Sequence, residues 1–163
     1  MTTRLWWWRQ ILMAAGLIML VPTTGAGQRG GGPTPRLELS ISPTVITFPA
    51  SDPDLVPQIS SVPVTVSYRI RLSTGAWQLT VLASGNLMSG SSTVDISNVT
   101  WVATPVPPFL NGTLNHTVAQ VVASGVGNVN PAATGAVTFR LKNSWTYDSG
   151  TYTQTVVFTL TAP

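Results

Sequence analysis

The end of the chain shows the clearest alternation of apolar and polar residues. Tyr152, Val156, Phe158 and Leu160 share one face with Gln154, and the opposite face carries mostly threonine. A period of two with many β-branched residues is typical of a strand that buries one face. We therefore expect a closing strand whose large apolar side chains lie in the core.

Similar patterns follow one another along the preceding chain. Strands are expected at residues 37–41, 45–48, 62–72, 77–83, 94–103, 117–124 and 136–142. The turn signal at residues 73–75 predicts a hairpin between the strands on either side of it. A change of sides after Val94 predicts a β-bulge, and the prolines of residues 104–109 predict a crossover segment.

These elements together predict the fold class. About eight or nine short strands, with turn signals every 8–12 residues or so and no helical period after residue 26, are typical of a single antiparallel β-sandwich, immunoglobulin-like or pilin-like. A closed β-barrel is the alternative. We expect Trp77 and Trp101 to be core anchors, because large aromatic side chains dominate the interior of such sandwiches.

The first residues have the three parts of a secretory signal peptide. Arg4 and Arg9 form a basic region, residues 11–21 are apolar, and small residues follow as far as Ala26. An uncleaved membrane anchor is the alternative, but the apolar run is short against the roughly 20 residues that a spanning helix needs. We expect cleavage after Ala26, and the absence of cysteine excludes a lipid-modified leader.

Cleavage at that bond divides the chain into three parts. Residues 1–26 are the signal peptide, residues 27–35 are a flexible linker rich in glycine and proline, and residues 36–163 are the sandwich domain. The expected location is secreted, periplasmic or at the cell surface, with no stable membrane span after cleavage.

Charge excludes one class of partner. The chain carries a formal charge of +3, which falls to about +1 without Arg4 and Arg9, and charged residues make up 8% of it against the usual quarter or so. Nucleic-acid binding requires a dense basic patch. We therefore expect no nucleic-acid partner.

The sequence offers no catalytic, metal or cofactor site. His116 is the sole histidine, no Gly-x-Ser-x-Gly motif occurs, and cysteine is absent. Asp52 and Asp54 could offer oxygens to calcium, but they match no calcium-loop pattern. We expect a protein that is not an enzyme and uses no cofactor; a hydrolase built around His116 is the remote alternative.

The closing strand carries a resemblance. The run Ser-Gly-Thr-Tyr-Thr-Gln-Thr-Val-Val-Phe-Thr-Leu from residue 149 resembles the last strand of bacterial secreted β-sandwich proteins of the spore coat protein U and fimbrial-subunit kind. Asp148, Gly150 and Tyr152 are similar to the tyrosine corner of immunoglobulin domains, although Gln154 stands where those domains have cysteine. We interpret these three residues as a structural corner.

The resemblance implies an exported structural or adhesive surface protein that assembles by β-strand addition. Its partners would be copies of itself or other surface subunits, joined through edge strands. Residues 37–41 are a candidate donor strand, but we favour their pairing within their own domain. A carbohydrate- or ligand-binding module is the alternative function, with Trp145, Tyr147 and Phe109 as ligand-stacking residues.

Overall fold

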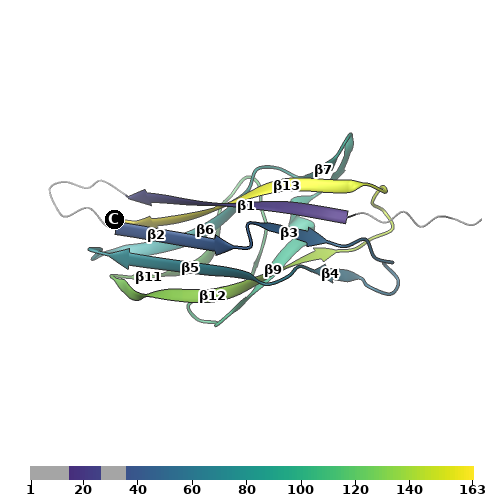
Figure 1. The fold of residues 1–163 in the computed structure, drawn as a ribbon. Coiled ribbons are helices and arrows are strands. Elements are labelled where there is room, and N and C mark those ends of the chain that lie inside the picture. The colour runs from purple at the N-terminus through teal and green to yellow at the C-terminus, as the bar shows by residue number, and fades with distance from the viewer. Residues whose placement is uncertain (1–14, 27–35) are drawn as a thin grey trace, which may run out of the picture.

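Alternating apolar and polar residues organise this chain into two stacked β-sheets (Figure 1). The computed structural model describes residues 15–26 and 36–163. The predicted linker, residues 27–35, lies outside the described residues. Within the described part the chain is all-β, with one short 3₁₀ turn, η1 (Ile96–Asn98), and no helix there is long and apolar enough to cross a membrane.

The first sheet has seven strands, with β13 near its middle. The order is β11-β6-β13-β1-β3, and β7 and β8 extend it beside β13. The bounds are β1 Ala15–Ala26, β3 Val45–Phe48, β6 Ala76–Ala83, β7 Leu87–Ser89, β8 Ser92–Val94, β11 Gln120–Val126 and β13 Thr151–Ala162.

The second sheet has six strands and packs its apolar face against the first. The order is β10-β9-β12-β5-β2, and β4 pairs with the end of β12. The bounds are β2 Arg36–Ser42, β4 Gln58–Ser60, β5 Val64–Arg71, β9 Val99–Thr104, β10 Gly112–Thr113 and β12 Val129–Lys142. The strand count exceeds the expected eight or nine because β4, β7, β8 and β10 have only two or three residues each, too few to show a period.

The closing strand buries the face that its sequence predicts. Tyr152, Val156, Phe158 and Leu160 are all buried, as are Trp77 and Trp101. The predicted core of β13 and the two tryptophan anchors are therefore confirmed. Neighbours on both sides of β13 keep these side chains between the two sheets.

The all-β sandwich-like architecture is confirmed, but the prediction of a purely antiparallel sandwich is wrong at one pair. β1 runs parallel to β13, with Ala15 opposite Thr151 and Ala26 opposite Ala162 (Figure 1). Strands so far apart in sequence are free to pair in either direction, since no short turn constrains them. The alternative of one closed barrel does not apply to the described residues, which form two separate sheets.

The predicted hairpin at residues 73–75 is also wrong. β5 lies in the second sheet and β6 in the first, so the chain crosses between sheets at this turn. Leu72 has a positive φ of 61°, and the backbone N–H of Ser73 donates to Oδ1 of Asn128 at 3.0 Å. β5 and β6 each have one apolar face. Two such strands can pair within one sheet or lie in two sheets that face each other, so the pattern does not distinguish a hairpin from a crossover.

The expected bulge after Val94 is a 3₁₀ turn that also moves the chain between sheets. Asp95 caps the turn, and its Oδ1 accepts a hydrogen bond from the backbone N–H of Ser97 at 2.8 Å. Hydrogen bonding from Ser97, first from its side chain and then from its backbone N–H, lowers the pKa of Asp95. β8 therefore belongs to the first sheet and β9 to the second.

Both buried tryptophans lie against glycines on the neighbouring strand. Trp77 is in register with Gly125, and Trp101 with Gly112. A Cβ added at either glycine would come within 2.5 Å of the indole ring. The indole N–H of Trp101 donates to the carbonyl of Leu110 at 2.7 Å, which satisfies its polar edge. The missing side chains thus provide the space that the rings fill.

This packing predicts that Gly125→Ala lowers the free energy of unfolding by about 1–3 kcal/mol, because the new methyl group overlaps the Trp77 ring. Ser124→Ala, at the exposed neighbouring position, is the control and should change it by less than about 0.5 kcal/mol. Urea unfolding followed by tryptophan fluorescence measures both values. Equal stability of the two variants would contradict the packing of Trp77 on Gly125.

Candidate functional site: the slot filled by β1 and the surrounding candidates

The segment with the leader pattern forms a strand inside the first sheet. β1 lies between β13 and β3, parallel to the first over 12 residues and antiparallel to the second (Figure 1). The backbone N–H of Leu20 also donates to the carbonyl of Thr44 at 2.7 Å. We call the space between β3 and β13 that this strand occupies the β1 slot.

Two side chains of β1 complete the core. Ile18 and Leu20 are buried, whereas Met19 between them is 51% exposed on the outer face. Ile18 is in register with Gln154 of β13 and Ile46 of β3. Burying aliphatic side chains of this size contributes about 1.5–3 kcal/mol each, so β1 contributes a large share of a typical domain stability of roughly 5–15 kcal/mol.

Gln154 is the polar side chain on the buried face of β13, and its amide is satisfied by its own surroundings. Its Nε2 donates to the carbonyl of Asn86 at 2.6 Å, and its Oε1 accepts from the backbone N–H of Thr155 at 2.7 Å. The residue opposite Gln154 in β1 therefore does not have to form a hydrogen bond with it. An aliphatic side chain such as that of Ile18 is sufficient at this position.

The second half of β1 is held differently. Pro22, Thr23 and Thr24 are exposed. The hydroxyl of Thr23 donates to the carbonyl of Phe158 at 3.1 Å and lies 2.9 Å from the hydroxyl of Thr159. Apolar burial in the slot is thus concentrated at Ile18 and Leu20, and backbone pairing continues beyond them.

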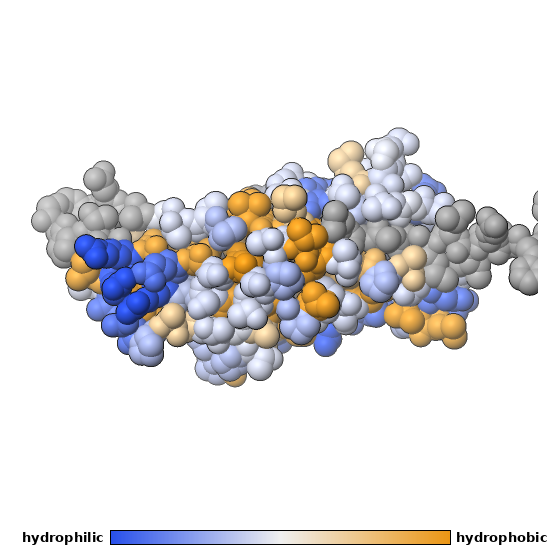
Figure 2. Space-filling model, in the orientation of Figure 1, coloured by the Kyte–Doolittle hydropathy of each residue, from blue (hydrophilic) through white to orange (hydrophobic). Residues whose placement is uncertain are grey.

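The outer face of this sheet is partly apolar. Figure 2 shows hydrophobic side chains in the middle of the visible face, where β1 and β3 lie above β2 and β5 in Figure 1. Met19, Val45 and Met88 are the large exposed apolar residues of these strands and of β7. Met19 is in register with Val45 and Thr155, and Met88 with Thr153, so the patch runs across the strands.

The candidate donor strand is paired inside its own domain. Residues 37–41 lie in β2, which pairs antiparallel with β5 from Arg36 opposite Arg71 to Ser42 opposite Thr65. Glu38 forms an ion pair with Arg71 across these strands. Internal pairing, the arrangement that the sequence favoured, is the one that the structure has.

The three candidate stacking residues do not form one site. Phe109 is fully buried, with its ring against Tyr68 at a centroid distance of 5.8 Å, and cannot stack on a ligand. Tyr147 is half-buried against the core, and burial raises the pKa of its hydroxyl. Trp145 is 55% exposed, and its indole N–H donates to Oδ1 of Asp54 at 3.0 Å.

Asp148, Gly150 and Tyr152 form hydrogen bonds and close contacts at the start of β13. The hydroxyl of Tyr152 donates to the backbone carbonyl of Asp148 at 3.0 Å. The carboxylate of Asp148 accepts from the hydroxyl of Ser92 at 2.6 Å, and a Cβ at Gly150 would lie 2.4 Å from Oγ of Ser89. These contacts join the entry of β13 to β7 and β8.

His116 is not part of a catalytic constellation among the described residues. It is exposed and lies near Asp95, whose pKa it lowers less than the hydrogen bonds from Ser97 do. No hydrogen bond joins its ring to a described hydroxyl or carboxylate group. The described part also contains no group of three metal-ligating side chains, and Asp52 uses its Oδ1 to accept from the backbone N–H of Asp54 at 2.9 Å.

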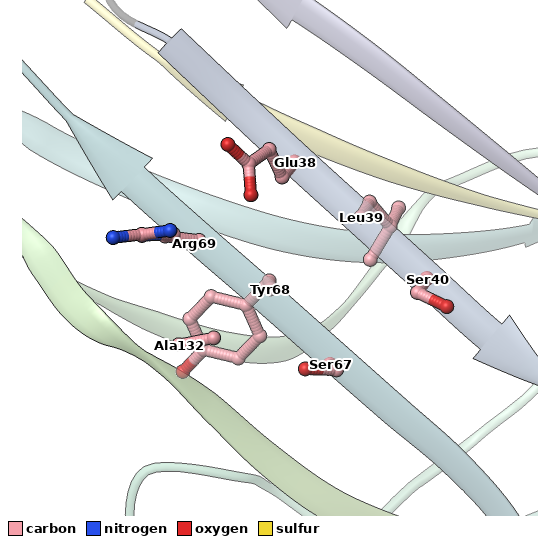
Figure 3. A pocket seen from close by; sticks show the side chains of 7 residues that line it. All are labelled: Glu38, Leu39, Ser40, Ser67, Tyr68, Arg69 and Ala132. Carbon is pink, nitrogen blue, oxygen red and sulfur yellow. The ribbon is translucent and has the colours of Figure 1, made fainter.

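A small hollow lies over β2 and β5 (Figure 3). Its volume of about 140 Å³ is well below the roughly 300–1,000 Å³ of sites for small molecules. The guanidinium of Arg69 beside it donates to Oδ1 of Asn130 at 2.7 Å and 3.1 Å. The lining residues are Glu38, Leu39, Ser40, Ser67, Tyr68, Arg69 and Ala132. This hollow does not suit a small-molecule ligand.

Sequence reasoning did not place the leader segment in the sheet. Residues 17–21 are uninterruptedly apolar, and such a run fits both the core of a signal peptide and a strand in a sandwich. The predicted cleavage after Ala26 stays a prediction. No protein-family model and no curated protein matches this chain.

The contact between Tyr152 and Asp148 predicts that Tyr152→Phe lowers the free energy of unfolding by about 0.5–1.5 kcal/mol, the usual net contribution of one hydrogen bond. Tyr147→Phe removes a hydroxyl that has no hydrogen-bond partner among the described residues, and it should change stability less. Urea unfolding of both variants measures the difference. A larger loss for Tyr147→Phe would contradict the role of this corner.

Proposed function

We propose that this chain is an exported, non-catalytic structural subunit of a surface assembly, and that subunits join by β-strand addition at the β1 slot. The observation that carries the proposal is that the segment with the signal-peptide pattern is also a strand of the first sheet. Cleavage after Ala26 would remove Ile18 and Leu20 from the core and leave β3 and β13 without their shared neighbour.

Loss of β1 from the slot would lower the stability of the domain. The two lost side chains correspond to roughly 3–6 kcal/mol of apolar burial, and unpaired backbone groups of β13 add to this. A strand from a neighbouring subunit would restore both the burial and the hydrogen bonds. The need for completion is the physical drive for assembly in this proposal.

The proposal also includes the finer assignment of the fold. We take the sandwich to be of the immunoglobulin-like or pilin-like kind. The hydrogen bond from the Tyr152 hydroxyl to the carbonyl of Asp148 supports it, because a tyrosine bonded to backbone a few residues upstream is a feature of such sandwiches. The subunits would lie outside the cytoplasm, where the leader directs them.

Removing residues 1–26 tests the proposal directly. We expect the chain of residues 27–163 to unfold at lower urea concentration than the full chain and to form multimers as its concentration rises. It should bind an added peptide of residues 15–26, and the bound peptide should restore stability and dissolve the multimers. Light scattering after size exclusion, with urea unfolding, measures these effects. A shortened chain that stays monomeric, binds no peptide and is as stable as the full chain contradicts the proposal.

Matched substitutions in the full chain separate the buried and exposed sides of β1. Ile18→Asp places a carboxylate in the core and should release the strand, so that the added wild-type peptide now binds. Met19→Asp adds the same charge on the exposed face and should leave the slot closed. Fluorescence anisotropy of a labelled peptide measures both. Equal binding to the two variants would show that the slot does not select by burial.

A further inference from the structure

A second feature lies at the end of the molecule where β3 leads into β4 and β12 into β13. In Figure 1 this is the end opposite the labelled C-terminus, and Figure 2 shows hydrophobic side chains there. Trp145 is 55% exposed and Leu55 is 80% exposed, although Trp77 and Trp101 are buried. Among the three tryptophans that the structure describes, Trp145 is the one with an exposed indole.

The two connections that form this end are fastened to each other. The side-chain amide of Asn143 donates to the carbonyls of Ser51 and Val56 at 2.9 and 3.0 Å, and its backbone N–H donates to the carbonyl of Pro57 at 2.9 Å. One residue of the second connection thus fixes both ends of a turn in the first. The end is a rigid platform because these bonds cross between the loops.

The orientation of Trp145 is set by the same turn. The backbone N–H of Val56 donates to the backbone carbonyl of Asp52 at 2.8 Å. The backbone N–H of Asp54 donates to the side-chain Oδ1 of Asp52 at 2.9 Å. Asp54 then accepts the indole N–H of Trp145 at 3.0 Å. The polar edge of the indole is satisfied and its position is fixed, so little side-chain freedom remains to be lost on binding.

The surrounding charges select the kind of ligand. Residues 49–57 and 143–150 contain three acids, Asp52, Asp54 and Asp148, and the basic residue that directly adjoins them is exposed Lys142, in register with Gln58. Carboxylates accept hydrogen bonds from hydroxyl groups and repel anions. The face of an indole is electron-rich and suits the weakly positive C–H groups of a saturated ring. A ring with an apolar face and hydroxyl groups at its rim fits both features.

We propose that this end of the molecule binds a neutral saccharide, with Trp145 as the stacking platform and Asp54 and Asp52 as acceptors for sugar hydroxyl groups. Phe109 is buried and takes no part, and half-buried Tyr147 packs against the core. A single platform without a deep cavity predicts weak binding, roughly millimolar for one ring. This site is separate from the β1 slot, so the exported subunit would attach to glycans at one end and assemble through the slot between β3 and β13.

Titration of the exported protein with neutral oligosaccharides tests the site. The probes are maltohexaose, cellohexaose and chitohexaose, and the readout is the indole N–H signal of Trp145 in ¹H–¹⁵N spectra. We expect at least one probe to shift this signal in a saturable manner and to leave the signals of Trp77 and Trp101 in place. Trp145→Ala should weaken binding of that probe at least tenfold, and Trp145→Phe, which keeps an aromatic face, should restore part of it.

Two further variants complete the experiment. Asp54→Asn removes the charge but keeps an acceptor oxygen and should weaken binding less than Asp54→Ala. Val126→Ala, at an exposed apolar residue of β11 outside both connections, should leave binding unchanged. Near-ultraviolet circular dichroism checks that each variant is folded. The proposal is overturned if no probe shifts the Trp145 signal, if binding survives Trp145→Ala, or if choline binds there and the saccharides do not.

Discussion

The backbone of β13 needs a hydrogen-bonding neighbour on each side, and the rest of the structure depends on how that need is met. β6 supplies one side through a ladder from Val156 opposite Ala83 to Thr161 opposite Gln78. β1 supplies the other side over the full length of β13. The same strand places Ile18 and Leu20 under the sheet, so one element provides both backbone pairing and apolar burial. Buried backbone groups without partners are costly, which makes this neighbour indispensable to the first sheet.

That dependence gives a structural role to the segment with the signal-peptide pattern. If the predicted signal peptide is cleaved, β1 is removed from the sheet. The empty slot would accept a strand in one direction and register, with apolar side chains on its buried face. The assembly proposal follows from this geometry more than from any chemical group. The proposed saccharide site is different in kind, because it depends on two connected turns and one exposed indole at the end of the sandwich. If both proposals hold, a subunit would assemble through the β1 slot and attach to saccharides at one end.

Much of the fold could be predicted from short-range patterns. The alternation in β13 identified Tyr152, Val156, Phe158 and Leu160 as core residues, and size alone placed Trp77 and Trp101 inside. Pairing partners could not be predicted in this way, because an apolar face fits a facing sheet as well as a neighbouring strand. The turn after Leu72 therefore joins two sheets where a hairpin was expected. The parallel β1–β13 pair was missed because residues 17–21 match a signal peptide and a buried strand equally well. Among the candidate site residues, the sequence could not tell that Phe109 is buried beside Gly135 while Trp145 stays exposed.

The central claim is that β13 requires a neighbour in the β1 slot. Hydrogen exchange of its backbone amides, measured on residues 27–163 with and without the peptide of residues 15–26, tests this most directly. The account predicts that, without the peptide, the β13 amides that point toward the slot exchange quickly while those bonded to β6 stay protected. Adding the peptide should protect both sets. Equal protection of both sets in the absence of the peptide and of multimers would contradict the account.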